Sequence, residues 1–374
     1  MIYDDLLKFP PYSISENEKH SLFKDALRET FDHHFNSCKP YRKFCEKAGL
    51  SAPLGDFDLT DLPYLPTDVF KKMRLSSVDE SSVVRTLQSS GTSGSIPSTV
   101  VIDNVTRTRQ VKTLMWLLSN FLGKERRPFV IMDVDPSTSS IQQQTITART
   151  AAIRGFLPAA STASYCMSID TDGKMSVDIP KLIKDLEKVE SQGKRAVLFG
   201  YTYVLFSYAA KSLLDQGIRF SLSNASIVHI GGWKKLQDEA VNKQDFNNTL
   251  NQVFGVPEGQ IIDAYGFTEQ LGLIYMDCED GVKRCPLVAD RVIRAPATLE
   301  PVPDGEPGMV ELITPLPHSY PGMAILLDDI GKVVSRESCK CGRHGTAFEV
   351  IGRATEAEIR GCGDVLAESL TGVV

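Results

Sequence analysis

Between residues 80 and 275, short apolar runs alternate with stretches of helical periodicity, and this alternation constrains the fold more than any other feature. The runs are almost continuously apolar, which indicates strands covered on both faces. Strands that alternate with helices form parallel sheets. The sequence therefore predicts an α/β fold with a mostly parallel sheet flanked by helices, with strands at 129–134, 196–199, 227–230 and 260–264 and helices at 105–122, 180–190 and 236–254.

The segments on either side of this region have different patterns. Up to about residue 75 the chain is typical of helix and loop, with Ser15 and Glu18 at capping-box spacing before an apolar helical face. After residue 290, short apolar runs at 310–313 and 324–327 alternate with prolines, which indicates a small β subdomain. We expect a helical region (1–75), an α/β core (76–295), a small β subdomain (296–353) and a short C-terminal tail (354–374).

Composition limits the classes of function. The 374 residues include 41 Lys+Arg and 47 Asp+Glu, which give a net charge of −6 without a basic cluster, so we expect no nucleic-acid partner. No run approaches the roughly 20 apolar residues of a membrane helix, and the acidic N-terminus does not resemble a secretory signal. Eight scattered cysteines fit a reducing compartment, so we expect a cytoplasmic protein without an integral membrane segment.

The first candidate site is a run of small residues between two predicted elements. Glycines allow close backbone approach, and backbone N–H groups with hydroxyls can surround phosphate oxygens. The GxxxxGK[ST] spacing of a Walker A loop is absent, and the run alone fits a flexible loop equally well. Five of its residues carry hydroxyl groups, and its members are Ser89, Ser90, Gly91, Thr92, Ser93, Gly94 and Ser95.

Two further motifs follow predicted strands. In the segment Asp263–Glu269, the ring of Tyr265 suits stacking on a flat base, and the oxygens of Thr268 and Glu269 suit Mg²⁺ beside a triphosphate. Later, Asp329 ends a strand, where a carboxylate can accept both ribose hydroxyls, and Arg353 in a Gly-Arg pair can neutralise phosphate. Each motif alone also fits an ordinary strand-end turn.

The order of these motifs, across about 265 residues, resembles that of the adenylate-forming (ANL) superfamily. Enzymes of that superfamily attack the ATP α-phosphate with a carboxylate, release pyrophosphate and pass the acyl group to a thiol. The resemblance implies that Ser89–Ser95 cradle phosphates, that Thr268 and Glu269 act beside Mg²⁺, that Tyr265, Gly266, Gly231 and Gly232 frame the adenine, that Asp329 holds the ribose, and that Arg353 supports the phosphate or the hinge.

A narrower resemblance, to the LuxE or acyl-protein synthetase family, covers residues from about 55 to 365. It rests on the Gly-Gly-Trp-Lys segment that begins at Gly231, on the segment Pro66–Lys71 and on Arg360-Gly361-Cys362. This resemblance implies an acid–thiol ligase that activates a fatty acid with ATP and Mg²⁺. It also implies that Cys362 carries the acyl group as a thioester for an acyl-accepting partner, such as a reductase or an acyl transferase.

The chain departs from most adenylate-forming enzymes after the Gly-Arg motif. Those enzymes continue into a mobile lid that carries a catalytic lysine, whereas only 21 residues follow Arg353 here and none is a lysine. We therefore expect a truncated C-terminal lid. Cys362 has glycine on both sides, so its segment can swing toward an adenylate, and a tethered thiol raises the effective concentration of the nucleophile. An inert tail thiol is the alternative.

Four other cysteines predict a second site. Cys278 and Cys285 follow the Tyr265 motif, and Cys339 and Cys341 form a Cys-x-Cys pair. Four thiolates in two pairs are a composition of structural zinc sites, and such a site would connect the β subdomain to the α/β core. The spacings differ from the usual Cys-x-x-Cys pairs, and four unliganded thiols are the alternative.

Two other readings of the function stay open. A ligase that passes an acyl or aryl group to coenzyme A or a carrier protein, resembling phenylacetate–CoA ligases, also fits the segment 339–343. A nucleotide-binding protein that has lost catalysis together with its lid is the third reading. At the ends of further strands, Tyr201 is a candidate wall of the acyl pocket, and His229 either lines a pocket or is a core histidine.

Overall fold

The computed structural model describes residues 2–89, 96–137, 145–170, 175–233, 239–336 and 338–354, without the side chains of 145–149. Cys362 and the segment 90–95 of the Ser/Gly run therefore lie outside the described residues. Among the described residues, no helix combines the length and the hydropathy that crossing a membrane requires. The domain boundaries expected from the sequence stay a prediction.

A six-stranded sheet with the spatial order β12-β11-β10-β9-β4-β6 forms the α/β part of the molecule. All neighbouring strands in it are parallel except β11 and β12. The predicted parallel sheet is confirmed, and each of the four predicted strands lies within two residues of its expected bounds. The strands are β4 (Arg127–Met132), β6 (Ala160–Tyr165), β9 (Val197–Tyr201), β10 (Ser226–Ile230), β11 (Ile261–Tyr265) and β12 (Tyr275–Met276).

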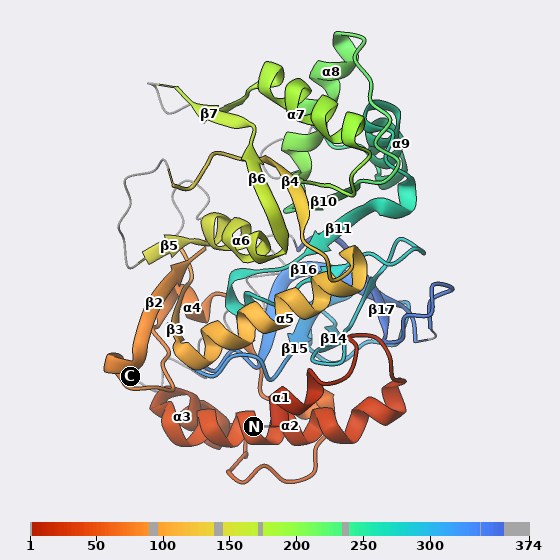
Figure 1. Cartoon of the computed structure of the whole chain (residues 1–374). Helices are drawn as coiled ribbons and strands as arrows, with labels where there is room; N and C mark the ends of the chain where they lie inside the picture. Colours follow the sequence, from red (N-terminus) through yellow and green to blue (C-terminus); the bar gives the residue numbers. More distant parts are fainter. Residues whose placement is uncertain are drawn as a thin grey trace.

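The two faces of this sheet pack into different apolar clusters, because successive strand residues point to opposite faces. Val130 and Leu198 belong to the cluster formed with α7 and α9, whereas Phe129 and Phe199 belong to the cluster on the α5 side. In Figure 1, α7, α8 and α9 lie at the top, and α5 crosses the middle of the view. The helices are α5 (Asn104–Leu122), α6 (Ala148–Phe156), α7 (Ile179–Gln192), a π-helix (Val204–Ala210), α8 (Lys211–Asp215) and α9 (Lys243–Phe254).

The start of α9 differs from the prediction. The side chain of Asn242 accepts a hydrogen bond from the Asp245 N–H and caps the helix, which therefore begins at Lys243 and not at residue 236. The helices predicted at 105–122 and 180–190 are confirmed within two residues.

A second large sheet supplies the expected β subdomain. Its main path has the order β13-β17-β16-β15-β14 and is antiparallel, and β1 pairs with β16 in parallel. The sheet therefore takes a strand from near residue 65 and begins again at residue 283, before the boundary expected at 296. Its strands are β1 (Leu65–Pro66), β13 (Lys283–Arg284), β14 (Asp290–Arg294), β15 (Gly308–Ile313), β16 (Ala324–Ser335) and β17 (Ala347–Arg353).

Smaller elements complete the described chain. A three-stranded sheet has the order β3-β2-β5, and β7 forms a hairpin with β8. These strands are β2 (Val83–Gln88), β3 (Thr99–Asp103), β5 (Thr145–Thr147), β7 (Met167–Ile169) and β8 (Met175–Val177). Short 3₁₀ turns lie at Leu59–Asp61, Glu80–Ser82, Leu157–Ala159, Glu258–Gln260 and Thr268–Gln270.

The N-terminal region is helical, as expected. Ser15 accepts a hydrogen bond from the Glu18 N–H, and the Glu18 carboxylate accepts one from the Ser15 N–H, so the predicted capping box is confirmed. These helices form a layer at the bottom of Figure 1. They are α1 (Ile2–Leu6), α2 (Glu16–Ser37) and α3 (Lys39–Lys47), whereas the short helix α4 (Val69–Lys72) lies higher in the view, beside β3.

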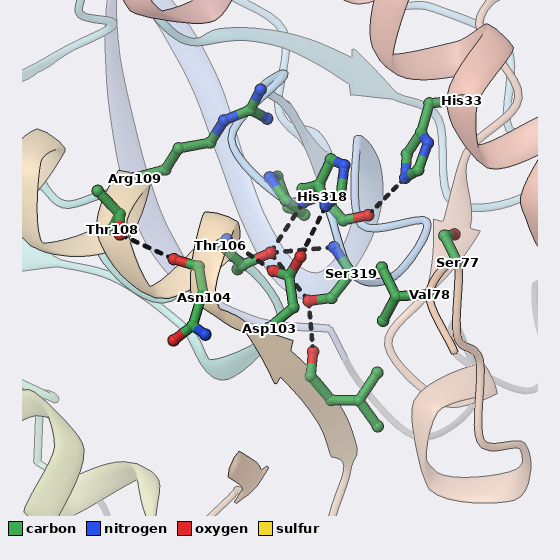
Figure 2. Close-up of polar contacts among 12 residues, drawn as sticks. His33, Ser77, Val78, Asp103, Asn104, Thr106, Thr108, Arg109, His318 and Ser319 are labelled. Carbon is green, nitrogen blue, oxygen red and sulfur yellow. Dashed lines mark hydrogen bonds and ion pairs between the residues drawn. The ribbon is translucent and has the colours of Figure 1, made fainter. Parts of the chain in front are cut away.

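A polar cluster fastens α2 to the start of α5 and to the loop before β16 (Figure 2). Asp103 accepts a hydrogen bond from the Thr106 N–H at 2.7 Å and contacts the His318 ring at 2.8 Å. His33 stacks on His318 with ring centroids 4.2 Å apart and hydrogen-bonds to its carbonyl oxygen at 2.9 Å. Hydrogen bonds from His318 and Thr106 hold the pKa of Asp103 at about 2 despite the opposing effect of its burial.

Candidate active site

A cavity of about 530 Å³ lies at the carboxyl ends of β9, β10 and β11. This is the position where parallel α/β sheets bind ligands. Strand β16 and the end of β17 form another part of its lining, so both large sheets contribute to one cavity. The predicted site residues that line it are Ser89, Gly231, Gly266, Thr268, Glu269, Asp329 and Arg353, together with Tyr201.

Tyr265 reaches the site through Asp329. The Tyr265 hydroxyl donates a hydrogen bond to the Asp329 carboxylate at 2.5 Å. Burial raises the pKa of Tyr265 well above its usual value, so the phenol stays protonated and donates throughout the neutral range. Burial raises the pKa of Asp329, and the Tyr265 hydrogen bond opposes that rise. The Arg353 Nε lies 3.8 Å from Asp329, with its side chain 76% exposed.

Two carboxylates, the buried Glu269 and the half-buried Asp328, form the acidic part of the cavity lining. Burial raises the pKa of Glu269 and of Asp328, and the nearby Lys71 charge lowers the pKa of both. Ser98 donates a hydrogen bond to Glu269, and Thr67 donates one to Asp328 at 3.5 Å. Hydroxyl and carboxylate oxygens are the ligands that a hard divalent cation prefers, so this donor set fits the predicted Mg²⁺.

The turn that carries Thr268 and Glu269 is held from behind. Gln270 is fully buried and donates hydrogen bonds to the carbonyl oxygens of Leu312 and Gly322, each at 3.0 Å. The Tyr320 hydroxyl donates to the Glu269 carbonyl oxygen at 2.7 Å. The antiparallel sheet and the loop before β16 therefore fix the turn that follows the parallel strand β11.

Apolar side chains form much of the remaining cavity lining. Gly272 adopts φ +97°, and a Cβ there would lie 2.5 Å from the Gln110 Cα, so only glycine lets this wall meet α5 so closely. The apolar lining includes Ile102, Val111, Leu114, Ala151, Phe156, Leu271, Leu273 and Ile274.

Several lining residues were not predicted from the sequence. Thr67 and Lys71 belong to a segment that entered only as part of the family resemblance, and Arg85, Arg107 and Arg154 were not considered. Thr67 and Lys71 could have been found from the sequence, because both belong to the segment Pro66–Lys71 that supports the family resemblance.

Other predicted residues lie elsewhere. Gly232 and Tyr265 are not part of the cavity lining, although Gly231 and Gly266 beside them are. His229 is buried, hydrogen-bonds to the Thr202 hydroxyl at 3.0 Å and lies 3.7 Å from Asp263, so it is a core histidine.

The predicted cysteine site is only partly assembled as expected. Ligand atoms of Cys278, Cys339 and Asp280 lie within 4.8 Å of one another, and the Cys341 thiol contacts that of Cys339. Cys285 lies outside this group and is buried near Tyr12 and Tyr275. The structure thus joins three of the four predicted cysteines to an aspartate that the sequence analysis did not consider.

The fold is that of adenylate-forming ligases. A crystal structure of 2-hydroxyisobutyryl-CoA ligase in the postadenylation state superposes with a TM-score of 0.66 at 13% identity, over 91% of this chain and 69% of that one. An open conformation of the same ligase superposes with a TM-score of 0.66, over 91% of this chain and 76% of that one. The predicted fold class is confirmed.

Sequence comparison narrows this class to a family. The family model "Acyl-protein synthetase, LuxE" matches residues 1–371, and the chain belongs to the LuxE acyl-protein synthetase family. The long-chain-fatty-acid–luciferin-component ligase of Vibrio harveyi is 26% identical over 98% of this chain and 93% of that one. The protein of the same name from Aliivibrio fischeri is 25% identical over 96% and 92%. The chain is therefore an acid-activating ligase that works through an acyl-adenylate.

Proposed function

We propose that this ligase activates a long-chain fatty acid with ATP and Mg²⁺ and then transfers the acyl group to its own Cys362. The observation that carries the proposal is a single cavity whose lining combines charged side chains, among them Glu269, Asp328, Asp329 and Arg353, with apolar side chains from α5, α6 and the segment 271–274. An adenylate of a fatty acid likewise combines a charged, polar nucleotide with an apolar chain. The relatives named above are ligases of long-chain fatty acids.

Each charged group of the cavity lining has a role that follows from its chemistry. Asp329, held by Tyr265, accepts hydrogen bonds from the ribose hydroxyls. Glu269 and Asp328 hold Mg²⁺, which when bound neutralises triphosphate charge. Lys71 lies near both carboxylates and supplies a positive charge for phosphate oxygens. The substrate carboxylate displaces pyrophosphate from the α-phosphate, and Ser89, which lines the cavity, contacts the phosphate oxygens.

The last described residue before Cys362 is Ala354, and it is bonded to a residue of the cavity lining. The Ala354 N–H donates to the Asp328 carbonyl oxygen at 2.8 Å, and Asp328 lines the cavity. Cys362 follows eight positions later, and eight extended residues span at most about 26–29 Å. The thiolate attacks the acyl carbonyl carbon, a C–S bond forms, the C–O bond to phosphate breaks and AMP leaves with that electron pair, while the thiol proton passes to solvent.

Intact-protein mass spectrometry tests the transfer. The protein is incubated with ATP, Mg²⁺ and a panel of fatty and aryl acids without coenzyme A. A hydroxylamine-labile gain of one acyl group is expected with fatty acids, absent in Cys362→Ser and retained in the control Cys38→Ser. The Cys362→Ser variant should keep acid-dependent ATP–pyrophosphate exchange, because adenylation precedes the thiol step.

The alternatives give different outcomes in the same experiment. Acylation absent from the wild type, with AMP released only after coenzyme A or a carrier protein is added, would show a ligase with an external acceptor. No exchange with any acid would show a nucleotide-binding protein without ligase activity. The proposed acyl-accepting partner, a reductase or an acyl transferase, is identified by loss of the acyl mass when the candidate protein is added.

A further inference from the structure

Two loops that lie far apart in the sequence share one backbone geometry. The loop Cys278–Gly281 follows β12, and the loop Cys339–Gly342 lies between β16 and β17. In each, the N–H of the first cysteine donates to the carbonyl oxygen four residues later, at 2.9 and 2.8 Å. In each, the glycine N–H donates back to that cysteine carbonyl at 2.8 Å, and the glycine has positive φ, +72° and +81°. The two loops are therefore equivalent tight turns.

Each turn carries a metal-ligating side chain at its first and third positions. These are Cys278 and Asp280 in one loop, and Cys339 and Cys341 in the other. The ligand atoms of Cys278, Asp280 and Cys339 lie within 4.8 Å of one another, and Cys341 contacts Cys339. In a tetrahedral zinc site with bonds of 2.0–2.3 Å, ligand atoms are about 3.5 Å apart, so a small contraction of the cluster suffices.

We propose that Cys278, Asp280, Cys339 and Cys341 bind one structural zinc ion. Three thiols lose their protons to solvent on binding, and three thiolates with one carboxylate complete a closed tetrahedral site. Cys285 does not take part, because it lies outside the cluster and is buried against other side chains. This proposal does not depend on the proposed acyl transfer.

The surroundings of the cluster suit thiolate ligands. The Cys341 sulfur accepts a hydrogen bond from Arg343 at 3.1 Å, and the Cys339 sulfur accepts one from the Cys341 N–H at 3.4 Å. The Arg284 guanidinium lies 3.8 Å from the Asp280 carboxylate. Such donors and cations offset the excess negative charge of three thiolates and a carboxylate around a divalent ion.

The metal would join the two large sheets at their common edge. β12 pairs with β11 of the parallel sheet, while β13 pairs with β17 of the antiparallel sheet. One ligand loop connects β12 to β13, and the other leads into β17, whose last residue is Arg353. Zinc binding therefore stabilises the position of β17, whose last residue, Arg353, lines the cavity.

Metal analysis of the full chain tests the site. The protein is purified without chelators, supplied with ZnSO₄, desalted and measured by inductively coupled plasma mass spectrometry. About one zinc per chain is expected, lost in Cys278→Ser and Cys339→Ser, weakened at least tenfold in Asp280→Ala and unchanged in Cys285→Ala. Substitution of wild-type protein by Co²⁺ should produce thiolate-to-metal charge-transfer and tetrahedral ligand-field bands, a readout that needs no variant to fold.

Three outcomes would overturn the proposal. The first is wild-type protein without stoichiometric zinc and without cobalt bands. The second is loss of zinc in Cys285→Ala with full retention in Asp280→Ala, which would assign the metal to the four cysteines instead. The third is a protein mass lower by two hydrogens without zinc, which would show a disulfide within the cluster.

Discussion

Replacing Tyr265 by Phe removes one hydrogen bond from the ribose end of the site and leaves the aromatic ring. The Tyr265 hydroxyl donates to Asp329 at 2.5 Å, whereas the positively charged Arg353 side chain is 3.8 Å away from that carboxylate and largely exposed. The Asp329 carboxylate therefore depends on Tyr265 for its orientation. We expect the variant to bind ATP more weakly while its chemical step is little changed.

The size of the effect follows from the type of hydrogen bond. A hydrogen bond to a charged group contributes about 1.5–3 kcal/mol, which corresponds to roughly a 10- to 150-fold change in an equilibrium constant. Because the ribose is held equally before and during the reaction, the loss should raise KM for ATP and leave kcat within about threefold. The Tyr265 hydrogen bond also lowers the pKa of Asp329. Its removal should therefore move the acid limb of the kcat/KM profile to higher pH.

Initial rates of ATP–pyrophosphate exchange as a function of ATP concentration and pH measure both effects. Tyr275→Phe is the matched control, because the buried Tyr275 hydroxyl has no hydrogen-bond partner among the described residues. An unchanged KM for ATP in Tyr265→Phe, with an unshifted acid limb, would refute the role of this hydrogen bond. An equal rise of KM in the control would refute it as well.

Three further predictions concern stability and are checked by urea denaturation. Arg294→Met should destabilise the protein by about 3–5 kcal/mol, because Arg294 contacts the fully buried Glu311 at 2.5 Å. The double variant Arg294→Met/Glu311→Leu should have nearly the stability of the wild type. An equal loss of stability in the single and double variants would contradict this. Burial raises the pKa of Glu311 from 4.5 to about 7, so between these pH values Glu311 binds a proton in the native state that it has lost in the unfolded state. The free energy of unfolding should therefore fall by about 3 kcal/mol as the pH rises through this range, and the Glu311→Gln variant should not show this fall. Gly272→Ala should lower the free energy of unfolding by more than about 2 kcal/mol, because its Cβ would lie 2.5 Å from the Gln110 Cα. The control Gly305→Ala, where φ is +92° and no atom is close, should lower it by only about 1 kcal/mol. Similar losses in both variants would show that the close approach to α5 does not matter.

The parts of the fold that local pattern determines were predictable. The apolar runs that became β4, β9, β10 and β11 have buried residues on both faces, and this continuous hydrophobicity is visible in the sequence. Glu269 was predictable because it lies just beyond the end of β11, where the fold class places ligands. Arg353 was predicted from its Gly-Arg pair. Asp329 was expected to end a strand, and this position is wrong, because β16 continues from Ala324 to Ser335 and Asp329 lies within it.

The unpredicted parts depend on contacts between distant segments. Lys71 reaches the cavity because the two-residue strand β1 pairs with β16, and so short a strand has no periodicity to detect. Asp280 joins the cysteine cluster because two tight turns bring their side chains together. The spacing in the sequence, in contrast, predicted Cys285 as a zinc ligand as strongly as Cys278. Pairing across the sheet, and not residue type, decides these positions.

The pairing of β1 with β16 also bears on when the protein becomes competent during its synthesis. Thr67 and Asp328, which meet in the cavity wall, are separated by 261 positions in the chain. The ribosome synthesises the segment with Thr67 long before the segment with Asp328. This part of the cavity lining therefore stays incomplete in the nascent chain until β16 has left the ribosome. Closure of a contact so distant in sequence is slow compared with local helix formation. The ability to hold ATP is therefore acquired late, by the nearly finished chain, and not by its growing α/β part.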